Sequence, residues 1–459
     1  MLLKPNLTFL ISINFIIALI IFCLSLNSSF PDQNDYLALA DGILHGQFSS
    51  YHDLDGNYPN ALRSPGYPLF LSVILAVSNN IFIVKLIQLS IYFCTILLAL
   101  RIVARLSSSD IPQYTFLILS SISFQIPYYA ALISSELVTI FNIILILYLL
   151  INRDNSSVKV NIYTGMAFAS LAMIKPAFVL LPFTVFFIGI VFQRQHTKNY
   201  IIILLTFILG CIPFATWNKV NHGVLKPTTI EGMATIAHMG FWNFKLPSGY
   251  QSTFDNYQSF IVPDLSNPFK NSSAEELENI RKFEKEWGDI NLALEPFIPD
   301  NFQNDLLTMK SDPTIFVTYP TAYVIEREKL LTQALLKNIK NDPAYFIKTR
   351  TYNFFRVFFT GINKSNFTSE TSKFKKVQMI AAFGITFTII FCGFIYTSFF
   401  VLKNWRNLSY EFLLIYIFII YTAGVHMPFS VQARYSVPIH LCLLILLSII
   451  TPRLYLNKK

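Results

Sequence analysis

The sequence carries little charge for its length. Only 13% of its 459 residues are charged, whereas 53% are hydrophobic and the mean hydropathy is +0.49. A soluble globular protein of this size needs more charge than this to cover its surface. The composition therefore predicts a protein that is solvated largely by lipid.

A long basic stretch interleaved with aromatic residues is also missing, although the formal net charge is +9. The Lys and Arg residues are spread over short loops and the two ends of the sequence. Nucleic-acid binding needs a concentrated basic patch. The distribution argues against a nucleic-acid partner and favours membrane topology as the reason for the positive charge.

Cysteine is scarce, and no Cys-x-x-Cys pair occurs. The five cysteines all fall inside apolar runs: Cys23, Cys94, Cys211, Cys392 and Cys442. This placement offers neither a cysteine metal site nor an evident disulfide framework in the loops. We interpret these residues as small apolar packing residues.

Apolar runs, by contrast, are abundant. Many have about 18 to 25 residues, the length that a helix needs to cross roughly 30 Å of hydrocarbon. Helices are expected because they satisfy their own backbone hydrogen bonds in lipid. The first run lacks a small-x-small cleavage site before Phe30, which favours an uncleaved span over a signal peptide. Ten spans are predicted, at about 7–27, 81–104, 111–129, 131–151, 161–174, 177–193, 199–216, 377–402, 411–426 and 436–452.

Basic residues fall on one side of these spans. With the N-terminus inside, every inside segment is basic, as the positive-inside rule requires. Two long segments then lie outside, 28–80 and 218–376. The sequence predicts an all-α membrane protein of about ten transmembrane helices. Its parts are an N-terminal transmembrane catalytic module at 1–217 that includes the loop 28–80, an external domain of mixed structure at 218–376, and C-terminal transmembrane helices at 377–459.

The two external segments contain helical patterns that are too short or too polar to span. In the first, we expect an interfacial helix from Asp35 to Leu44 and an apolar stretch from Gly66 to Val77. The second has helix-like patterning from Tyr323 to Phe359. No internal repeat typical of inverted-repeat transporters is evident. The asymmetric arrangement of the loops favours an enzyme over a transporter of this kind.

Polar residues within or beside the spans collect on the external side. An ionisable residue in a span costs about 2.5–3.5 kcal/mol unless it has a partner, a cavity or an interfacial place. Taken alone, each has a plainer interpretation: a helix cap for Asp35, a headgroup contact for Lys175, an interfacial histidine for His426. Their joint placement predicts a site. The residues concerned are Asp32, Asp35, Arg63, Glu136, Lys175, Asn218, His426 and Arg434.

Short motifs occur in order around these residues. They are DQNDY at 32–36, RSPGYP at 63–68, Ser135 with Glu136, IKP at 174–176, Trp217 and Asn218 with Thr228, Thr229 and Gly232, Asp342 with Pro343, and His426 followed by RYSVP at 434–438. The set covers nearly the whole chain and resembles the bacterial GT-C type glycosyltransferases, relatives of protein O-mannosyltransferases and lipid A aminoarabinose transferases. One position departs from the family pattern, because Trp217 stands where Arg is common; Lys219 can substitute for it in a phosphate contact.

The resemblance implies that a sugar is transferred, with inversion, from a polyprenyl-phosphate donor to an acceptor hydroxyl of a lipid, glycan or protein. By register against Tyr36 it assigns the catalytic base to Asp32, with Asp35 as the second choice. It implies phosphate contacts from Arg63, Lys175 and Arg434. The residues implied to position substrate are Tyr36, Tyr67, Glu136, Asn218, His426 and Tyr435.

The donor already carries its phosphate, so the resemblance implies no cofactor and requires no nucleotide-binding metal motif; a divalent metal is left open but is not indicated. We expect the protein in the inner (plasma) membrane, among its lipids, with the site facing the periplasm. Two alternatives remain open. One is a transporter or flippase of lipid-linked sugars or small solutes, which would place charges near the bilayer midplane. The other is an O-antigen-type polymerase or ligase.

Overall fold

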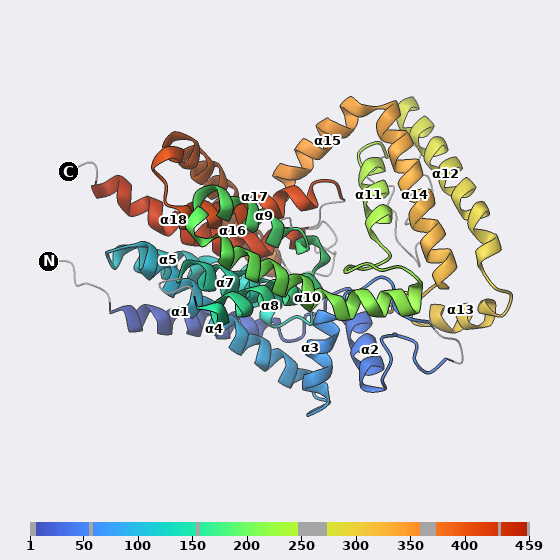
Figure 1. Cartoon of the computed structure of the whole chain (residues 1–459), viewed down its shortest axis with the longest axis horizontal. Coiled ribbons are helices and arrows are strands. Elements are labelled where there is room, and N and C mark those ends of the chain that lie inside the picture. Colours follow the sequence, from blue (N-terminus) through green and yellow to red (C-terminus); the bar gives the residue numbers. More distant parts are fainter. Residues whose placement is uncertain are drawn as a thin grey trace.

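The protein is built from helices (Figure 1). The computed structural model describes residues 6–54, 58–152, 157–246, 273–358, 373–429 and 433–456. These residues form α-helices, short 3-10 helices and loops, with no β-strand among them. The predicted all-α class is confirmed for this part of the chain.

Within these ranges, five helices are long and apolar enough to cross a membrane. They are α1 (Leu7–Ser25), α4 (Ile81–Leu106), α10 (Thr197–His222), α16 (Lys373–Asn404) and α18 (Val437–Leu456). Large apolar side chains point outward from them, including Leu24, Leu209 and Phe399. Lipid is the solvent in which such exposure is favourable, so the helices have membrane character.

Six further apolar helices have 10 to 17 residues. They are α3 (Gly66–Leu75), α5 (Ile111–Ile122), α7 (Glu136–Ile151), α8 (Val158–Ile174), the segment of η1 (Pro176–Phe178) with α9 (Leu181–Phe192), and α17 (Tyr410–His426). They coincide with predicted spans or with the predicted short stretch at 66–77. Since they are shorter than a full crossing, the count of ten spans stays a prediction.

The expected span at 111–129 is not one helix, and here the prediction is wrong. α5 ends at Ile122 and a separate helix, α6 (Gln125–Ala130), follows. Pro127 explains the break, because its ring would clash with the Ser123 carbonyl in a continuous helix and it has no N–H to donate to that carbonyl. In the third position of α6 the same proline is tolerated, since the first N–H groups of a helix have no partner within it.

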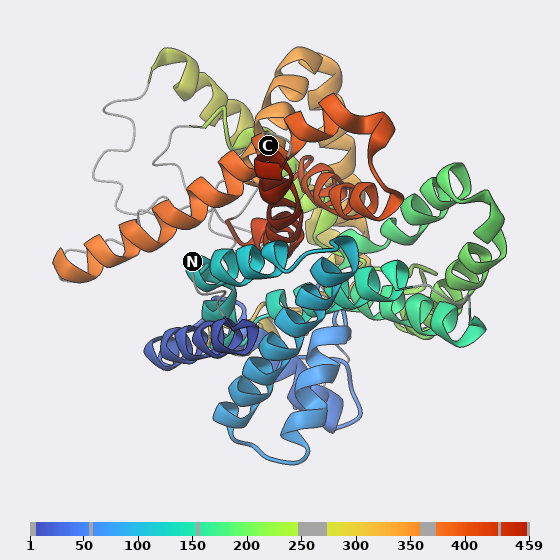
Figure 2. The same cartoon turned by 90° about the vertical axis from the view of Figure 1, so that its left-hand side faces the viewer.

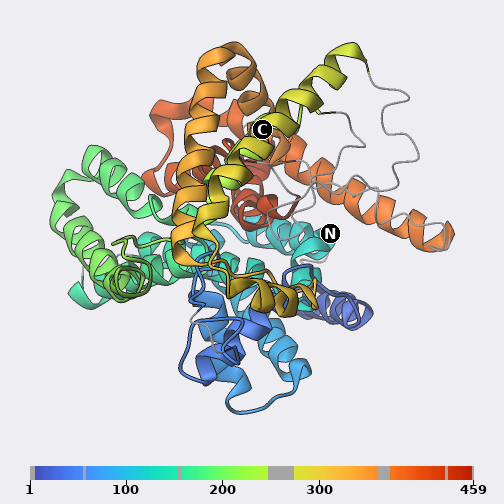
Figure 3. The same ribbon diagram turned by 90° about the vertical axis from the view of Figure 1, so that its right-hand side faces the viewer.

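Helices α11 (Met233–Trp242), α12 (Ala274–Leu294), α13 (Phe302–Lys310), α14 (Thr321–Asn341) and α15 (Pro343–Arg356) gather at one end of the molecule (Figures 1 and 3). They share a second hydrophobic core, which includes Phe283, Trp287 and Tyr323. Mixed structure was expected at 218–376, but its described residues are helical. Apolar residues on α12 and α14 recur with helical spacing, and Ser273 and Glu276 form a capping box at the start of α12.

The start of α1 and the end of α18 lie at the opposite end (Figure 1), which faces the viewer in Figure 2. Between the two ends, the first loop forms α2 (Gln33–Leu44) and α3, close to the two helices predicted there. Gly66 starts α3 directly against the end of α8: a Cβ at this position would lie 2.6 Å from the Met173 carbonyl carbon. Glycine thus allows the first loop to approach the end of α8.

Candidate functional site

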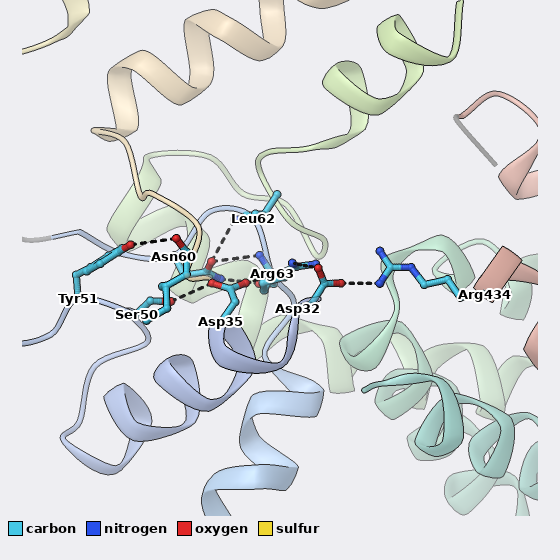
Figure 4. Close-up of polar contacts among 9 residues, drawn as sticks. Asp32, Asp35, Ser50, Tyr51, Asn60, Leu62, Arg63 and Arg434 are labelled. Carbon is cyan, nitrogen blue, oxygen red and sulfur yellow. Dashed lines mark hydrogen bonds and ion pairs between the residues drawn. The ribbon is translucent and has the colours of Figure 1, made fainter. Parts of the chain in front are cut away.

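Four charged side chains form an alternating chain at the start of α2 (Figure 4). Arg63 Nε lies 2.7 Å from Asp35 Oδ2, and Arg63 Nη2 lies 3.1 Å from Asp32 Oδ1. The other Asp32 oxygen, Oδ2, accepts from Arg434 Nη1 at 2.5 Å. Arg434 comes from η6 (Ala433–Ser436), immediately before α18. We call these four residues the charge chain.

Glu136 and Lys175 form a second ion pair nearby. Lys175 Nζ lies 3.2 Å from Glu136 Oε1, and Arg434 interacts electrostatically with both of them. Glu136 is the first residue of α7, and Lys175 follows the last residue of α8. The second carboxylate oxygen of Glu136 is buried and accepts no hydrogen bond from the described residues. It is therefore an acceptor that a ligand could satisfy.

Local sequence explains where the acids sit. Asp32 occupies the N-cap position of α2 and Asp35 its first turn, where the helix dipole favours negative charge. Asp32 makes no side-chain capping bond, so both its oxygens stay available to the arginines. Asn60 shapes the loop before Arg63, accepting from the Arg63 N–H at 3.2 Å and donating to the Arg63 carbonyl at 2.7 Å.

Aromatic rings surround the cations. Arg63 lies over the rings of Tyr36 and Phe316, 5.2 and 4.8 Å from their centroids. Arg434 lies 5.1 Å from the Phe30 centroid, and Lys175 lies 5.9 Å from that of Tyr435. These rings shield the charges from water and favour cations over their faces.

His426, the last residue of α17, stacks on Tyr435 with a centroid separation of 4.4 Å. Its Nδ1 lies 2.7 Å from the Thr422 carbonyl oxygen. In the neutral ring, an N–H at Nδ1 that donates to this carbonyl leaves Nε2 as an acceptor. His426 thus lies beside the charge chain without pairing with it.

The two aspartates differ in proton affinity. Burial acts to raise the pKa of Asp32, but the Arg63 and Arg434 guanidiniums outweigh it and hold this pKa below the usual range. For Asp35, burial is the larger effect and raises the pKa despite the Arg63 guanidinium, with the negative charge of Asp32 adding to the rise. Asp32 is thus the more firmly ionised of the two, and Asp35 binds its proton more readily.

Two predicted site residues, Tyr67 and Asn218, form their hydrogen bonds with groups other than these charged side chains, although the Tyr67 ring packs against Tyr36. The Tyr67 hydroxyl donates to Gln88 at 2.8 Å, and the Gln88 amide donates to the Ala130 and Leu132 carbonyls. Asn218 donates to the carbonyls of Lys226 and Thr228, at 2.6 and 2.9 Å. Both side chains fasten backbone segments around the site.

The sequence motifs did not reveal several neighbours of the charge chain. Ser50 donates to Asp35 at 3.4 Å, and the Phe316 backbone N–H also donates to Asp35. Phe316 comes from the loop between α13 and α14, so no local signal connected it to α2. For Asn60 a signal existed, since an Asn shortly before Arg63 and Pro65 favours a tight turn.

The segment that carries Arg434 is held from outside the apolar helices. Arg350 on α15 donates to the carbonyls of Gly240, at 2.5 Å, and Pro428. Asn353 donates to the carbonyl of Phe429 at 2.9 Å. α15 therefore joins α11 to the loop after α17, and this loop leads to η6 and Arg434.

The pKa shifts predict opposite pH effects for the two aspartates. Asp32→Asn should destabilise the folded protein near pH 7 by about 3–5 kcal/mol, because it leaves two arginines with side chains only 16% and 21% exposed facing an amide. The pKa of Asp32 is lowered on folding, so its contribution is present above the ordinary pKa of 3.8 and is lost as the pH falls below it. The gap in thermal midpoint between wild type and Asp32→Asn in detergent should therefore narrow from pH 5 to pH 3.

Asp35→Asn is the matched control. The pKa of Asp35 is raised on folding, so its contribution to stability is greatest below pH 3.8 and declines as the pH rises. The midpoint of wild type relative to Asp35→Asn should fall as the pH rises from 3 to 5. If the difference in thermal midpoint from wild type follows the same pH trend in both variants, the opposite pKa shifts assigned to Asp32 and Asp35 are wrong.

Comparison with known proteins adds no relative to this picture. No family model, curated protein or solved structure matches the chain. The likeness to GT-C type enzymes accordingly rests on the ordered motifs and is taken forward below as a proposal.

Proposed function

We propose that the protein is a membrane glycosyltransferase of GT-C type that moves a sugar from a polyprenyl-phosphate donor to the hydroxyl of a lipid, glycan or protein acceptor. The observation that carries the proposal is a set of three buried acids and three bases with side chains only 13–21% exposed, formed by the charge chain and the pair of Glu136 with Lys175. Such a set is costly beside apolar helices and is typical of functional sites.

The cations suit a lipid-linked phosphate. A polyprenyl chain lies among lipid tails, and its phosphate lies at the level where apolar helices end. Arg434 lies just before α18, and Lys175 lies between α8 and η1, so both are at helix ends. Arginine guanidiniums bind phosphate oxygens through paired hydrogen bonds, and lysine adds a point charge.

Asp32 suits the role of general base. In the transfer step the acceptor oxygen forms a bond to the anomeric carbon, its proton passes to the Asp32 carboxylate, and the bond from that carbon to the phosphate oxygen breaks. The leaving group is the polyprenyl phosphate monoester, which gains one negative charge that Arg63, Lys175 and Arg434 would stabilise. Attack opposite the leaving group inverts the anomeric centre.

Donor binding would also activate this base. In the structure, two guanidiniums hold Asp32 and keep its pKa low, which makes it a weak base. A donor phosphate that takes over hydrogen bonds from Arg434 would weaken that hold and raise the proton affinity of Asp32. Asp35, whose pKa is raised, can take up a proton to balance the added negative charge.

The remaining residues suit supporting roles. The free oxygen of Glu136 is an acceptor for a sugar hydroxyl, and the ring pair of His426 and Tyr435 offers a flat surface beside Lys175. Tyr36 orients Arg63 through its ring. Tyr67 and Asn218 act through the backbone that they hold, as positioning residues.

Substitutions in this set should lower donor turnover far more than substitutions elsewhere. With purified protein and a panel of polyprenyl-phosphate sugars, Asp32→Asn should reduce turnover by about 10²- to 10⁴-fold through loss of the base. Arg434→Gln and Lys175→Gln should each reduce it by about 10²- to 10³-fold through loss of phosphate stabilisation. Release of polyprenyl phosphate is the readout.

Lys198→Gln is the matched control. Lys198 is exposed in the first turn of α10, at the end opposite Asn218, so this substitution should leave turnover within about twofold of wild type. Full turnover by Asp32→Asn would contradict the assigned base. If no donor is consumed but reconstituted vesicles move a solute or a lipid-linked sugar, the transporter alternative replaces the proposal. Processive chain growth on a lipid-linked glycan would favour the polymerase alternative.

The proposal includes an orientation in the inner membrane, with the charge chain and α11–α15 on the periplasmic side. In a cysteine-free background, Glu278→Cys on α12 should react with a membrane-impermeant maleimide in intact spheroplasts. Arg406→Cys, between α16 and α17, should react only after permeabilisation. Both side chains are exposed, so reaction of Arg406→Cys alone in intact spheroplasts would reverse the orientation.

A further inference from the structure

We propose that the end of α2 and the loop after it form a binding site for a divalent metal ion of the zinc class. Its ligands are Asp41, His45 and His52, with Asp53 as a fourth. One ligand atom from each of the first three residues lies within 4.8 Å of the others. The site is separate from the charge chain, and the inference does not rest on the proposed glycosyl transfer.

The spacing of the ligand atoms is close to what zinc needs. His52 Nε2 lies 3.4 Å from Asp41 Oδ2 and 3.1 Å from Asp53 Oδ1, and His45 Nδ1 lies 3.8 Å from Asp41 Oδ1. A tetrahedral zinc ion with bonds of about 2.0–2.2 Å separates its ligand atoms by roughly 3.4 Å. His45 Nδ1 also lies 2.9 Å from the Asp41 carbonyl oxygen, so the His45 ring would have to turn away from this carbonyl to bring a nitrogen to the ion.

Charge also calls for a cation at this place. Two carboxylates face one nitrogen of His52, and a neutral imidazole offers only a single hydrogen there. Neither Asp41 nor Asp53 forms an ion pair with Lys or Arg in the described part of the chain. The C-terminal end of α2 adds the negative pole of the helix dipole. A divalent ion would offset the negative charge of both carboxylates and of the helix end.

The backbone holds the ligands ready. Gly46 has a φ of +83°, and the chain reverses there, with the Gln47 N–H donating to the Gly42 carbonyl at 2.8 Å. A Cβ at Gly42 would lie 2.0 Å from the Ser49 carbonyl oxygen, so only glycine lets the returning loop pack on α2. As a result the His52 side chain is only 10% exposed. Its ring stacks on the His45 ring, with the two ring centroids 4.5 Å apart.

The metal would fix the loop that flanks the charge chain. Ser50, two residues before His52, donates to Asp35, and the Phe48 carbonyl accepts from the Asn60 N–H at 2.9 Å. Asn60 in turn holds the backbone of Arg63. Metal binding is thus expected to stabilise the folded first loop, since a ligand that binds only the folded state raises its stability.

The test uses full-length, tag-free protein in detergent after treatment with EDTA. Calorimetric titration with Zn²⁺ should show one equivalent per chain, and Co²⁺ should give the intense visible absorption of a tetrahedral site. The double variant His45→Asn with His52→Asn should bind Zn²⁺ at least tenfold more weakly. Zn²⁺ should raise the thermal midpoint of wild type and leave that of the double variant unchanged.

His196→Asn, a histidine substitution in η2 (Arg194–His196) at the far end of α10, should behave as wild type. Should the double variant not remain monodisperse, Asp41→Asn provides the same test with less change in shape. No zinc uptake by wild type, or equal uptake by the ligand variants, would overturn the inference.

Discussion

Asp32 accepts hydrogen bonds from two arginines at once, and this shared ion pair joins the beginning of the chain to its end. One partner, Arg63, belongs to the same loop as Asp32, whereas the other, Arg434, lies 402 residues after Asp32 in the sequence. A buried ion without partners costs several kcal/mol, so the Asp32 carboxylate depends on its two arginines, and Arg434 depends on Asp32. The residues just before α18 are thereby joined to the loop that contains α2, and Asp35 pairs with Arg63 on the other side of Asp32.

Much of the surrounding structure serves to bring these groups together. Gly66 lets the first loop approach the end of α8, beside Lys175, and Asn60 sets the turn that presents Arg63. On the other side, Arg350 and Asn353 hold the loop that leads to Arg434. Residues of the α11–α15 region therefore contribute to the site by holding the loop after α17 and by contacting Arg63 and Asp35 through Phe316.

The sequence predicted the helical class and most helix positions, because runs of apolar residues in a chain with so little charge leave few other solutions. The sequence also predicted that these six charged residues gather, because the basic loops assign all of them to one side of the membrane. The structure shows the six side chains near one another, whereas the side of the membrane stays a prediction. Pro127 was a local signal for the helix break, but the apolar pattern continues across it and favoured a single span. Contacts of Phe316 and Arg350 could not be predicted, because they join segments that share no periodicity and are distant in the chain. The difference in environment between Asp32 and Asp35 also needed geometry: only the structure shows that one has two arginine partners and the other has one.

If Arg63, Lys175 and Arg434 form a site for a lipid-linked phosphate, the protein should distinguish undecaprenyl phosphate from undecaprenol, which lacks the phosphate. Native mass spectrometry of the detergent-solubilised protein with each lipid measures this difference. Wild type should bind the phosphate at least tenfold more tightly than the alcohol, and Arg434→Gln with Lys175→Gln should abolish this preference while leaving binding of the alcohol unchanged. Equal binding of the two lipids by wild type, or a preference that survives in the double variant, would show that these cations do not bind the phosphate.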